Sequence, residues 1–155
     1  MRTRTIWAFA FSFVLATVVP AKDHAKAGTP VFKPAADVKW TDLDPAGAPG
    51  VKIADVWGNH ANGAFGAFLK FPAGFVAPLH THTNAIKIVV LSGTYMQTPE
   101  GKPEVRLGPG SYAFQPGGTY RHISACDKTS ECELFIQSSG KFDLKPAGAA
   151  KAPAK

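Results

Sequence analysis

Three histidines are the residues of this sequence best suited to hold a metal ion. His80 and His82 are separated by a single residue, and His122 lies further along the chain. Successive side chains of a β-strand point to opposite faces, so His80 and His82 would point to the same side of a strand. Two imidazoles on one face form half of a metal site. A third imidazole from another strand would complete a three-nitrogen site, which suits Zn, Cu, Fe or Ni.

The elements that must position these histidines are predicted to be short strands. Between residues 31 and 144 the sequence alternates apolar and polar residues in short runs interrupted by Gly and Pro, with no long helical period. This pattern favours a small antiparallel β-barrel or jelly roll, with an edge-exposed sandwich without a cavity as the alternative. We expect strands over residues 53–57, 66–71, 75–82, 85–91, 94–97, 104–107, 111–115, 120–125 and 133–137.

The N-terminus resembles an export signal. Residues 1–27 begin with two arginines, continue with an uncharged apolar run over 6–19, and contain small-residue cleavage sites after Ala21 and Ala27. A membrane-spanning helix needs roughly 20 residues, so this run is short for an uncleaved membrane anchor, which is the alternative. We therefore expect a periplasmic or secreted protein that is not held in a membrane after cleavage.

The two ends of the mature chain differ in composition from its centre. Residues 28–50 are proline-rich and are predicted to form an N-terminal arm, residues 51–144 the barrel, and residues 145–155 a disordered tail of Ala, Pro, Gly and Lys. The formal net charge of +6 comes from the basic ends, and the folded part is near neutral. We therefore expect no binding of nucleic acid, which requires a basic patch on a folded face.

Cys126 and Cys132 are the two cysteines of the chain. The polar segment between them is typical of a hairpin loop, which would place the cysteines opposite each other on adjacent antiparallel strands, near bridging distance. In an oxidising compartment we expect them to form a disulfide. Free buried thiols and a thiolate metal site are the alternatives.

The spacing of the glycines and histidines resembles the two motifs of the cupin family. In the first, Gly74 precedes the His80-Thr81-His82 triplet by six residues and Gly93 follows it, but Ile86 stands where the motif has a glutamate. The second motif has a glycine, then Pro-x-Gly, then a histidine, and Gly110 and Pro116-Gly117-Gly118 match its first parts. The histidine of this chain, His122, lies one residue beyond the consensus position, which Arg121 occupies. The resemblance covers most of the mature chain and is closest to exported bacterial cupin-domain proteins of unassigned function.

The resemblance implies a cupin jelly roll with His80, His82 and His122 as metal ligands. With Ile86 in place of the glutamate, the first motif supplies no anionic ligand. The two glycines before His122 could absorb the extra residue. If they do not, Arg121 enters the barrel, where it would suit binding of a carboxylate without a metal. Both alternatives remain open at this point.

The resemblance further implies a metal-dependent enzyme that binds a small oxygenated or anionic metabolite. The cofactor would be a divalent Fe, Mn, Ni, Cu or Zn ion, and the chemistry either dioxygenase-like or that of a Lewis acid. A non-catalytic cupin that binds a small molecule or a metal is the alternative, because no general acid or base is evident. Cupins also pair as homodimers through an edge strand or an N-terminal segment, and residues 31–49 could provide such an arm.

Other polar residues could complete the site. Asn84 could orient a ligand or could simply belong to a turn, Gln115 could bind a metal weakly or support a ligand, and either Tyr95 or Gln97 is expected at the mouth of the barrel. Tyr120 and Arg121 are further candidates for the substrate side. We expect two other residues outside the site, His60 in a solvated loop and Lys87 on the exterior.

Overall fold

The computed structural model describes residues 29–148, and residues 33–148 of these belong to one compact unit. The predicted export signal over residues 1–27 and most of the predicted C-terminal tail lie outside the described residues. Within residues 29–148, no helix has the length and apolar character needed to cross a membrane.

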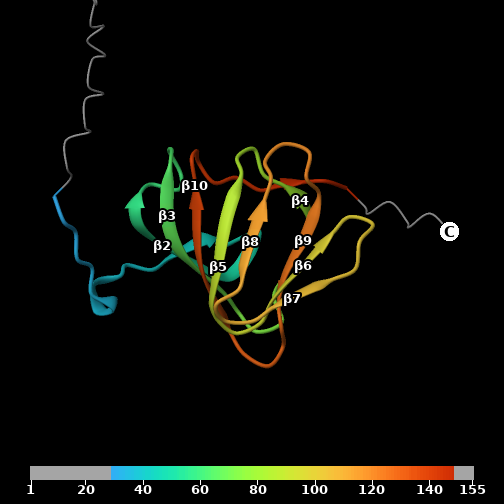
Figure 1. Ribbon diagram of the computed structural model, residues 1–155, viewed down its shortest axis with the longest axis horizontal. Coiled ribbons are helices and arrows are strands. Elements are labelled where there is room, and N and C mark those ends of the chain that lie inside the picture. The colour runs from blue at the N-terminus through green and yellow to red at the C-terminus, as the bar shows by residue number, and fades with distance from the viewer. Residues whose placement is uncertain (1–28, 149–155) are drawn as a thin grey trace, which may run out of the picture. The chain divides into compact units, whose positions relative to one another are not determined.

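Two antiparallel sheets make up the fold (Figure 1). The six-stranded sheet has the order β1-β2-β3-β10-β5-β8, with β1 (Thr41–Asp44), β2 (Ala48–Gly58), β3 (Phe65–Phe71), β10 (Cys132–Ser138), β5 (Ile86–Ser92) and β8 (Tyr112–Gln115). The five-stranded sheet has the order β11-β4-β9-β6-β7, with β11 (Lys145–Pro146), β4 (Val76–Thr81), β9 (His122–Cys126), β6 (Tyr95–Pro99) and β7 (Val105–Leu107). A short 3₁₀ helix, η1 (Ala35–Asp37), precedes β1.

This jelly roll confirms the all-β fold class, and each of the nine predicted strands has a counterpart. The strands form two sheets rather than one continuously closed barrel. Two strands have no counterpart in the prediction. β1 lies within the range predicted as an N-terminal arm, and β11 within the first residues of the predicted tail. Both are short and polar at their exposed positions, so neither has the apolar alternation that marks a strand in the sequence.

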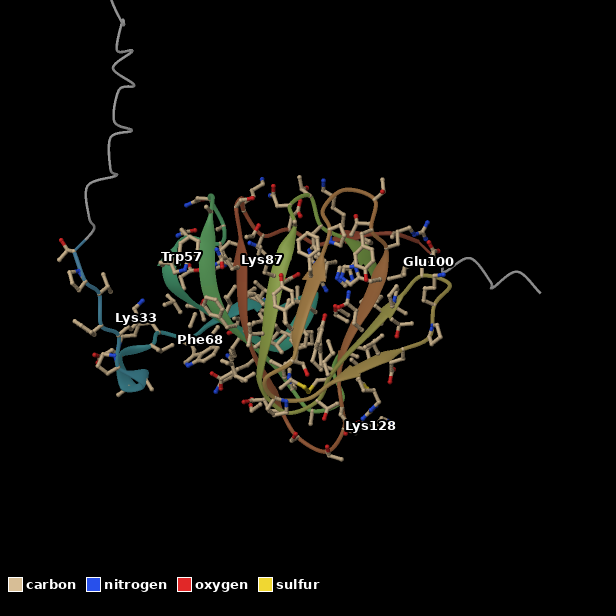
Figure 2. All side chains as sticks on the ribbon, viewed as in Figure 1. Lys33, Trp57, Phe68, Lys87, Glu100 and Lys128 are labelled. Atoms are coloured by element: carbon tan, nitrogen blue, oxygen red, sulfur yellow. A yellow bond between two sulfur atoms is a disulfide. The ribbon has the colours of Figure 1, made fainter. Side chains whose placement is uncertain are left out.

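The hydrophobic core lies between the two sheets and follows the alternation of each strand. In β5, Ile86, Ile88 and Val90 are buried, while Lys87 is exposed on the outer face, as predicted (Figure 2). Their partners across the sheet, Leu134 and Ile136 of β10, are buried as well. The burial of every second side chain therefore determines which face of the six-stranded sheet lines the interior.

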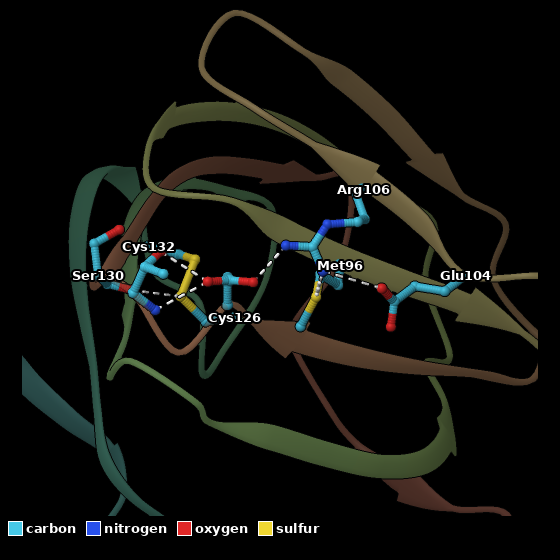
Figure 3. Close-up of polar contacts among 8 residues, drawn as sticks. Met96, Glu104, Arg106, Cys126, Ser130 and Cys132 are labelled. Atoms are coloured by element: carbon cyan, nitrogen blue, oxygen red, sulfur yellow. Dashed lines mark hydrogen bonds and ion pairs between the residues drawn. A yellow bond between two sulfur atoms is a disulfide. The ribbon is translucent and has the colours of Figure 1, made fainter.

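The predicted disulfide between Cys126 and Cys132 is present, but its setting differs from the expectation (Figure 3). Cys126 ends β9 in one sheet and Cys132 begins β10 in the other, so the two cysteines are not cross-strand neighbours within a sheet. The loop between them crosses from sheet to sheet, and the disulfide joins the two sheets there. Next to it, Asp127 pairs with Arg106 of β7, which also binds Glu104.

Candidate metal centre

The pairing of β4 with β9 brings two of the three histidines together. His80 and His122 are direct partners in this antiparallel pair, and their ring centroids lie 4.3 Å apart. Residues directly opposite each other in an antiparallel pair place their side chains on the same face. Both side chains therefore point into the interior, where His80 is 1% exposed and His122 is 0% exposed.

An irregularity in β4 allows His80 to face inward. Ala77 pairs with Ser124, but His80 pairs with His122, so β4 advances by one residue more than β9 between these two pairs. In a regular strand the burial of Ala77 would place Leu79 inside and His80 outside. The extra residue, next to Pro78, is a β-bulge that reverses this alternation and leaves both Leu79 and His80 buried.

His82 reaches the same interior from the segment just after β4. Its ring centroid lies 4.8 Å from that of His80 and 5.3 Å from that of His122. The turn before β9 packs against this segment, because the Gly118 backbone N–H donates to the His82 carbonyl over 2.8 Å. A Cβ atom at Gly117 would lie 2.5 Å from the Thr83 carbonyl oxygen, so the close approach requires glycine.

Each histidine donates its Nδ1–H to a backbone carbonyl. The acceptors are Pro78 for His80 at 2.6 Å, Asp143 for His82 at 2.5 Å and Tyr120 for His122 at 3.3 Å. A carbonyl can only accept, so Nδ1 carries the proton and Nε2 of each neutral ring keeps a free lone pair. This is the arrangement in which metal-binding histidines are held and oriented in proteins.

Burial keeps the three rings neutral. Burial is the main cause that lowers the pKa of His80 to about 4 and that of His122 to about 3, and the nearby His80 and His82 contribute to the low pKa of His122. Burial also lowers the pKa of His82, although the hydrogen bond to the Asp143 carbonyl opposes this. At neutral pH all three imidazoles are therefore unprotonated at Nε2, the form that binds a metal.

The donor set fits a divalent transition metal. One ring nitrogen from each histidine lies within 4.8 Å of the others. The Nε2 atom of His122 is buried and has no hydrogen-bond partner. A buried polar atom without a partner is costly, and a bound cation would satisfy it. Ile86, which stands in the place of the glutamate of the cupin motif, is buried and lines the same interior, so no carboxylate from that position joins the cluster.

The choice between His122 and Arg121 is settled by the register of β9. His122 is its first residue and faces inward, whereas Arg121 lies outside the cluster. The Arg121 Nε lies 3.0 Å from a carboxylate oxygen of Glu100, and its guanidinium donates to the Ala147 carbonyl over 2.7 Å. Glu100 is labelled in Figure 2, at the end of β6. The carboxylate-binding arrangement with an inward Arg121 is therefore not formed.

The other predicted polar residues divide into two groups. Gln97 is buried and donates to the Tyr120 hydroxyl over 2.8 Å, and the Tyr120 ring stacks on His122 with 4.9 Å between centroids. Gln97 and Tyr120 therefore support the histidine cluster. Asn84, by contrast, donates to the Lys141 carbonyl over 3.0 Å and does not line the interior cavity, which agrees with the turn alternative.

A second polar group lies deeper in the interior and includes Ser124, which the sequence did not single out. The Tyr95 hydroxyl lies 2.9 Å from the Ser124 hydroxyl and accepts from the Gln115 amide over 3.0 Å. Burial raises the pKa of Tyr95. Tyr95 and Gln97 share the inner face of β6, so both are buried rather than only one of them. The alternation of β9, in which His122 and Ser124 share a face, could have identified Ser124.

His60 differs from the expectation of a solvated loop histidine. Its Nδ1 lies 2.9 Å from a carboxylate oxygen of Asp55, and the side chain is 23% exposed. The Asp55 carboxylate also accepts from the His60 backbone N–H, so the pair fixes the loop after β2. His60 is thus a half-buried structural residue outside the three-histidine cluster.

Comparisons with known proteins agree with this fold. The model of the family described as "Domain of unknown function (DUF4437)" matches residues 32–155. No curated protein matches the chain.

Many solved structures resemble this chain, and three of them illustrate the similarity. KdgF from Halomonas sp. is 22% identical, with a TM-score of 0.56 over 72% of this chain and 94% of that one. The polyketide cyclase RemF from Streptomyces resistomycificus is 18% identical, with a TM-score of 0.63 over 82% of this chain and 90% of that one. An RmlC-like cupin from Shewanella frigidimarina NCIMB 400 is 18% identical, with a TM-score of 0.56 over 72% and 92%. These similarities confirm the cupin fold.

Proposed function

We propose that this chain, which belongs to the DUF4437 family and has the cupin fold, is a metal-dependent enzyme that acts on a small molecule. The observation that carries the proposal is the buried cluster of His80, His82 and His122, whose Nδ1 atoms are bound to carbonyls and whose Nε2 atoms are free to bind. The ion would be a divalent Fe, Mn, Ni, Cu or Zn, all of which bind imidazole.

The residues of the chain would hold the ion and leave it open to a substrate. Three neutral imidazoles bring no negative charge, so the ion keeps its full attraction for an oxygen atom of the substrate. When bound, it would supply Lewis-acid activation of that oxygen or, for a redox-active metal, dioxygenase-like chemistry. The apolar wall around the histidines, including Ile86, keeps bulk water away and strengthens these interactions.

A non-catalytic cupin that binds a metal or a small molecule is the second candidate. It is favoured by the lining of the inner cavity, where none of the described residues is an Asp, Glu, Lys or Arg. Apart from the histidines, the hydroxyl and amide groups of Tyr95, Ser124 and Gln115 are the polar groups there, and they bind one another. A proton transfer in the reaction would therefore rely on a bound water or on the substrate itself.

The metal content of the purified mature protein tests the first step. Without added metal, we expect near-stoichiometric Fe, Mn, Ni, Cu or Zn by elemental analysis, and loss of that metal in His80→Ala. His60→Ala is the matched control, because His60 lies outside the cluster and pairs with Asp55. The absence of metal under every loading condition would contradict the proposal.

Turnover separates the two candidates. The metal-loaded protein should convert at least one member of a panel of thiols, diketones, keto acids and sugar acids, and the His80→Ala variant should not. Metal binding without turnover of any compound would favour the non-catalytic alternative.

We also propose that the protein is exported to the periplasm or secreted. The disulfide between Cys126 and Cys132 supports this, because disulfides persist in oxidising compartments. Expression with its first 27 residues should place the protein outside the cytoplasm with a shortened N-terminus, measured by cell fractionation and intact mass. Retention in the cytoplasm at full length would contradict it.

A homodimer is a further part of the proposal. β1 ends the six-stranded sheet, and no described strand pairs with its outer edge. Such an edge can pair with a second copy of the chain. Size-exclusion chromatography with light scattering should give twice the chain mass, and a monomer at all concentrations would refute a role of this edge in pairing.

A further inference from the structure

The interior cavity that His80 and His82 border lies next to a larger groove. The inner cavity has a volume of about 50 Å³ and is bordered by His80 and His82. The groove has a volume of about 390 Å³ and is bordered by the ends of β1 and β2, by β4 and by the segment before β11. Six residues border both spaces: Leu43, Ala48, Phe75, Ala77, Phe142 and Leu144. The two spaces are therefore adjacent, and together they form the candidate ligand site, with the small cavity as its inner end.

The size of the groove exceeds the needs of a very small metabolite. Small-molecule sites in proteins have volumes of roughly 300–1,000 Å³, and the groove alone falls in this range. The inner cavity by itself has room for only a few atoms beside the histidines. A ligand that fills the site would place a compact group at the histidines and a larger body in the groove.

The side chains that line this site are apolar except for Asp44 in the groove and the polar groups at the inner end. The six shared residues are all aliphatic or aromatic, and among the described residues bordering either space none is a lysine or arginine. Asp44, at the edge of the groove, is the charged residue there. An anionic body would thus meet no opposite charge and would lie near a carboxylate, which disfavours it.

The hydrogen bonding of the polar groups at the inner end also indicates that the polar part of a ligand would lie at the histidines. Tyr95, Ser124 and Gln115 form hydrogen bonds with one another, so they do not require a partner from a ligand. The Nε2 atom of His122, in contrast, is buried without a partner. Among these polar groups, His122 is therefore the one that still has an unsatisfied nitrogen atom.

From these observations we propose that the ligand of this site is amphipathic, with an oxygen-containing head that chelates the metal and an uncharged apolar body of several carbons that fills the groove. The head rests on the metal site of the proposed function, whereas the apolar body rests on the groove alone. This narrows the small oxygenated or anionic metabolite expected from the sequence to a compound whose charge, if any, is confined to the head.

A series of alkyl hydroxamates tests the proposal on the metal-loaded protein. From acetohydroxamate to octanohydroxamate the chelating head is constant, and the chain lengthens one methylene at a time. Each buried methylene should tighten binding about fourfold, measured by isothermal titration calorimetry, until the groove is filled. An octanohydroxamate with a terminal carboxylate should bind more weakly than octanohydroxamate. Equal affinities along the series would overturn the proposal.

A pair of leucines provides matched variants. Leu144 borders the groove and the inner cavity, whereas Leu91 lies on the outer face of β5, and both are 41% exposed. In Leu144→Gln, octanohydroxamate should bind at least fivefold more weakly, and the loss of affinity for acetohydroxamate should be much smaller. In Leu91→Gln, both affinities should remain as in the unmodified protein. Equal effects of the two substitutions on octanohydroxamate would contradict a role of the groove.

A metal-independent measurement separates this proposal from the proposed function. The metal-free protein should bind the neutral fluorescent probe N-phenyl-1-naphthylamine, and Leu144→Gln should weaken that binding while Leu91→Gln does not. If the protein retains no metal but binds the probe in this way, the metal function fails and the apolar site stands. If the metal-free protein does not bind the probe, the apolar groove is refuted even when metal is bound.

Discussion

Each histidine of the cluster uses one ring nitrogen for the protein and keeps the other free. The carbonyls of Pro78, Asp143 and Tyr120 accept from Nδ1 and thereby fix both the tautomer and the orientation of the ring. Burial in an apolar wall then favours the neutral form. Orientation and neutrality together leave three preorganised nitrogen atoms that are suited to bind a metal ion.

Substitution of neighbouring residues tests the inward position of His122. His122→Asn should lower the metal content to a small fraction of the unmodified protein's, because the third nitrogen ligand is lost. Arg121→Gln should leave the metal content unchanged and cost only the surface contacts to Glu100 and Ala147. Elemental analysis of both purified variants measures this. Metal loss in Arg121→Gln alone would contradict the observed register.

The lowered histidine pKa values predict a dependence of stability on pH in the metal-free protein. Because the folded-state pKa values of His80 and His122 lie below the ordinary histidine value of 6.5, the unfolded chain binds more protons below pH 6.5. The free energy of unfolding should therefore be highest above pH 6.5 and fall by about 1–2 kcal/mol per histidine between pH 6.5 and 5.

Denaturant unfolding at pH 7, 6 and 5 after treatment with a chelator measures this slope. The His80→Asn variant is the control, since it lacks one of the titrating rings and should show a shallower slope. An unfolding free energy that does not change over this range would contradict the burial of neutral histidines.

At the level of elements, the site depends on how β4 and β9 are paired. The bulge at Pro78 turns His80 inward, and the turn before β9 places His122 opposite it. The segment carrying His82 is held against this turn by the hydrogen bond from Gly118 to the His82 carbonyl. The three histidines thus come from β4, from β9 and from the segment just after β4, all at the same end of the five-stranded sheet.

Two glycine substitutions test the role of this turn. In Gly117→Ala the new Cβ would lie 2.5 Å from the Thr83 carbonyl oxygen, so the segment next to His82 must shift. We expect a loss of about 1–3 kcal/mol in unfolding free energy and at least tenfold weaker metal binding.

Gly118→Ala is the comparison, because Gly118 has a φ of +81° but no neighbour within 4 Å of an added Cβ. It should cost about 1 kcal/mol through backbone strain and affect metal binding less. Denaturant unfolding and competition with a chelator measure both quantities. Stronger metal loss in Gly118→Ala than in Gly117→Ala would be the contradicting result.

In the molecule as a whole, the disulfide and the histidine cluster lie at opposite ends of β9. His122 begins the strand and Cys126 ends it, which separates them by about 13 Å along the strand. The disulfide links the two sheets at one end of β9, and the histidines lie at the other end, whereas the groove also borders Phe75, whose carbonyl accepts from the Cys126 backbone N–H. This separation allows the covalent link to stabilise the fold without constraining the three histidines.

Removal of the disulfide should therefore affect stability but not metal binding. The double variant Cys126→Ala/Cys132→Ala should lose about 2 kcal/mol of unfolding free energy, as expected for a short disulfide-closed loop. Its metal content at 25 °C should equal that of the unmodified protein, with the dithiothreitol-reduced protein as the control. Loss of metal from the folded double variant would show that the two ends are coupled.

The sequence by itself determined the fold class and singled out His80 and His82 as candidate metal ligands, with His122 or Arg121 as the third inward residue. Alternation of apolar residues, turns at Gly and Pro, and the spacing of Gly74, His80 and His82 are local properties, so the nine strands and the cupin resemblance could be predicted from them. The two cysteines could be paired because the loop between them is short. β1 and β11 were missed because their pairing comes from neighbouring strands and not from their own residues.

The tertiary structure decided what depends on contacts between distant segments. Whether Arg121 or His122 faces inward depends on the register of β9 against β4, and that register rests on pairs such as His80 with His122, which are far apart in the sequence. The bulge at Pro78, the link between the two sheets by the disulfide, and the apolar groove next to the histidines arise in the same way. Their physical basis is the packing of one sheet on the other, which cannot be read from the residue pattern of any single segment.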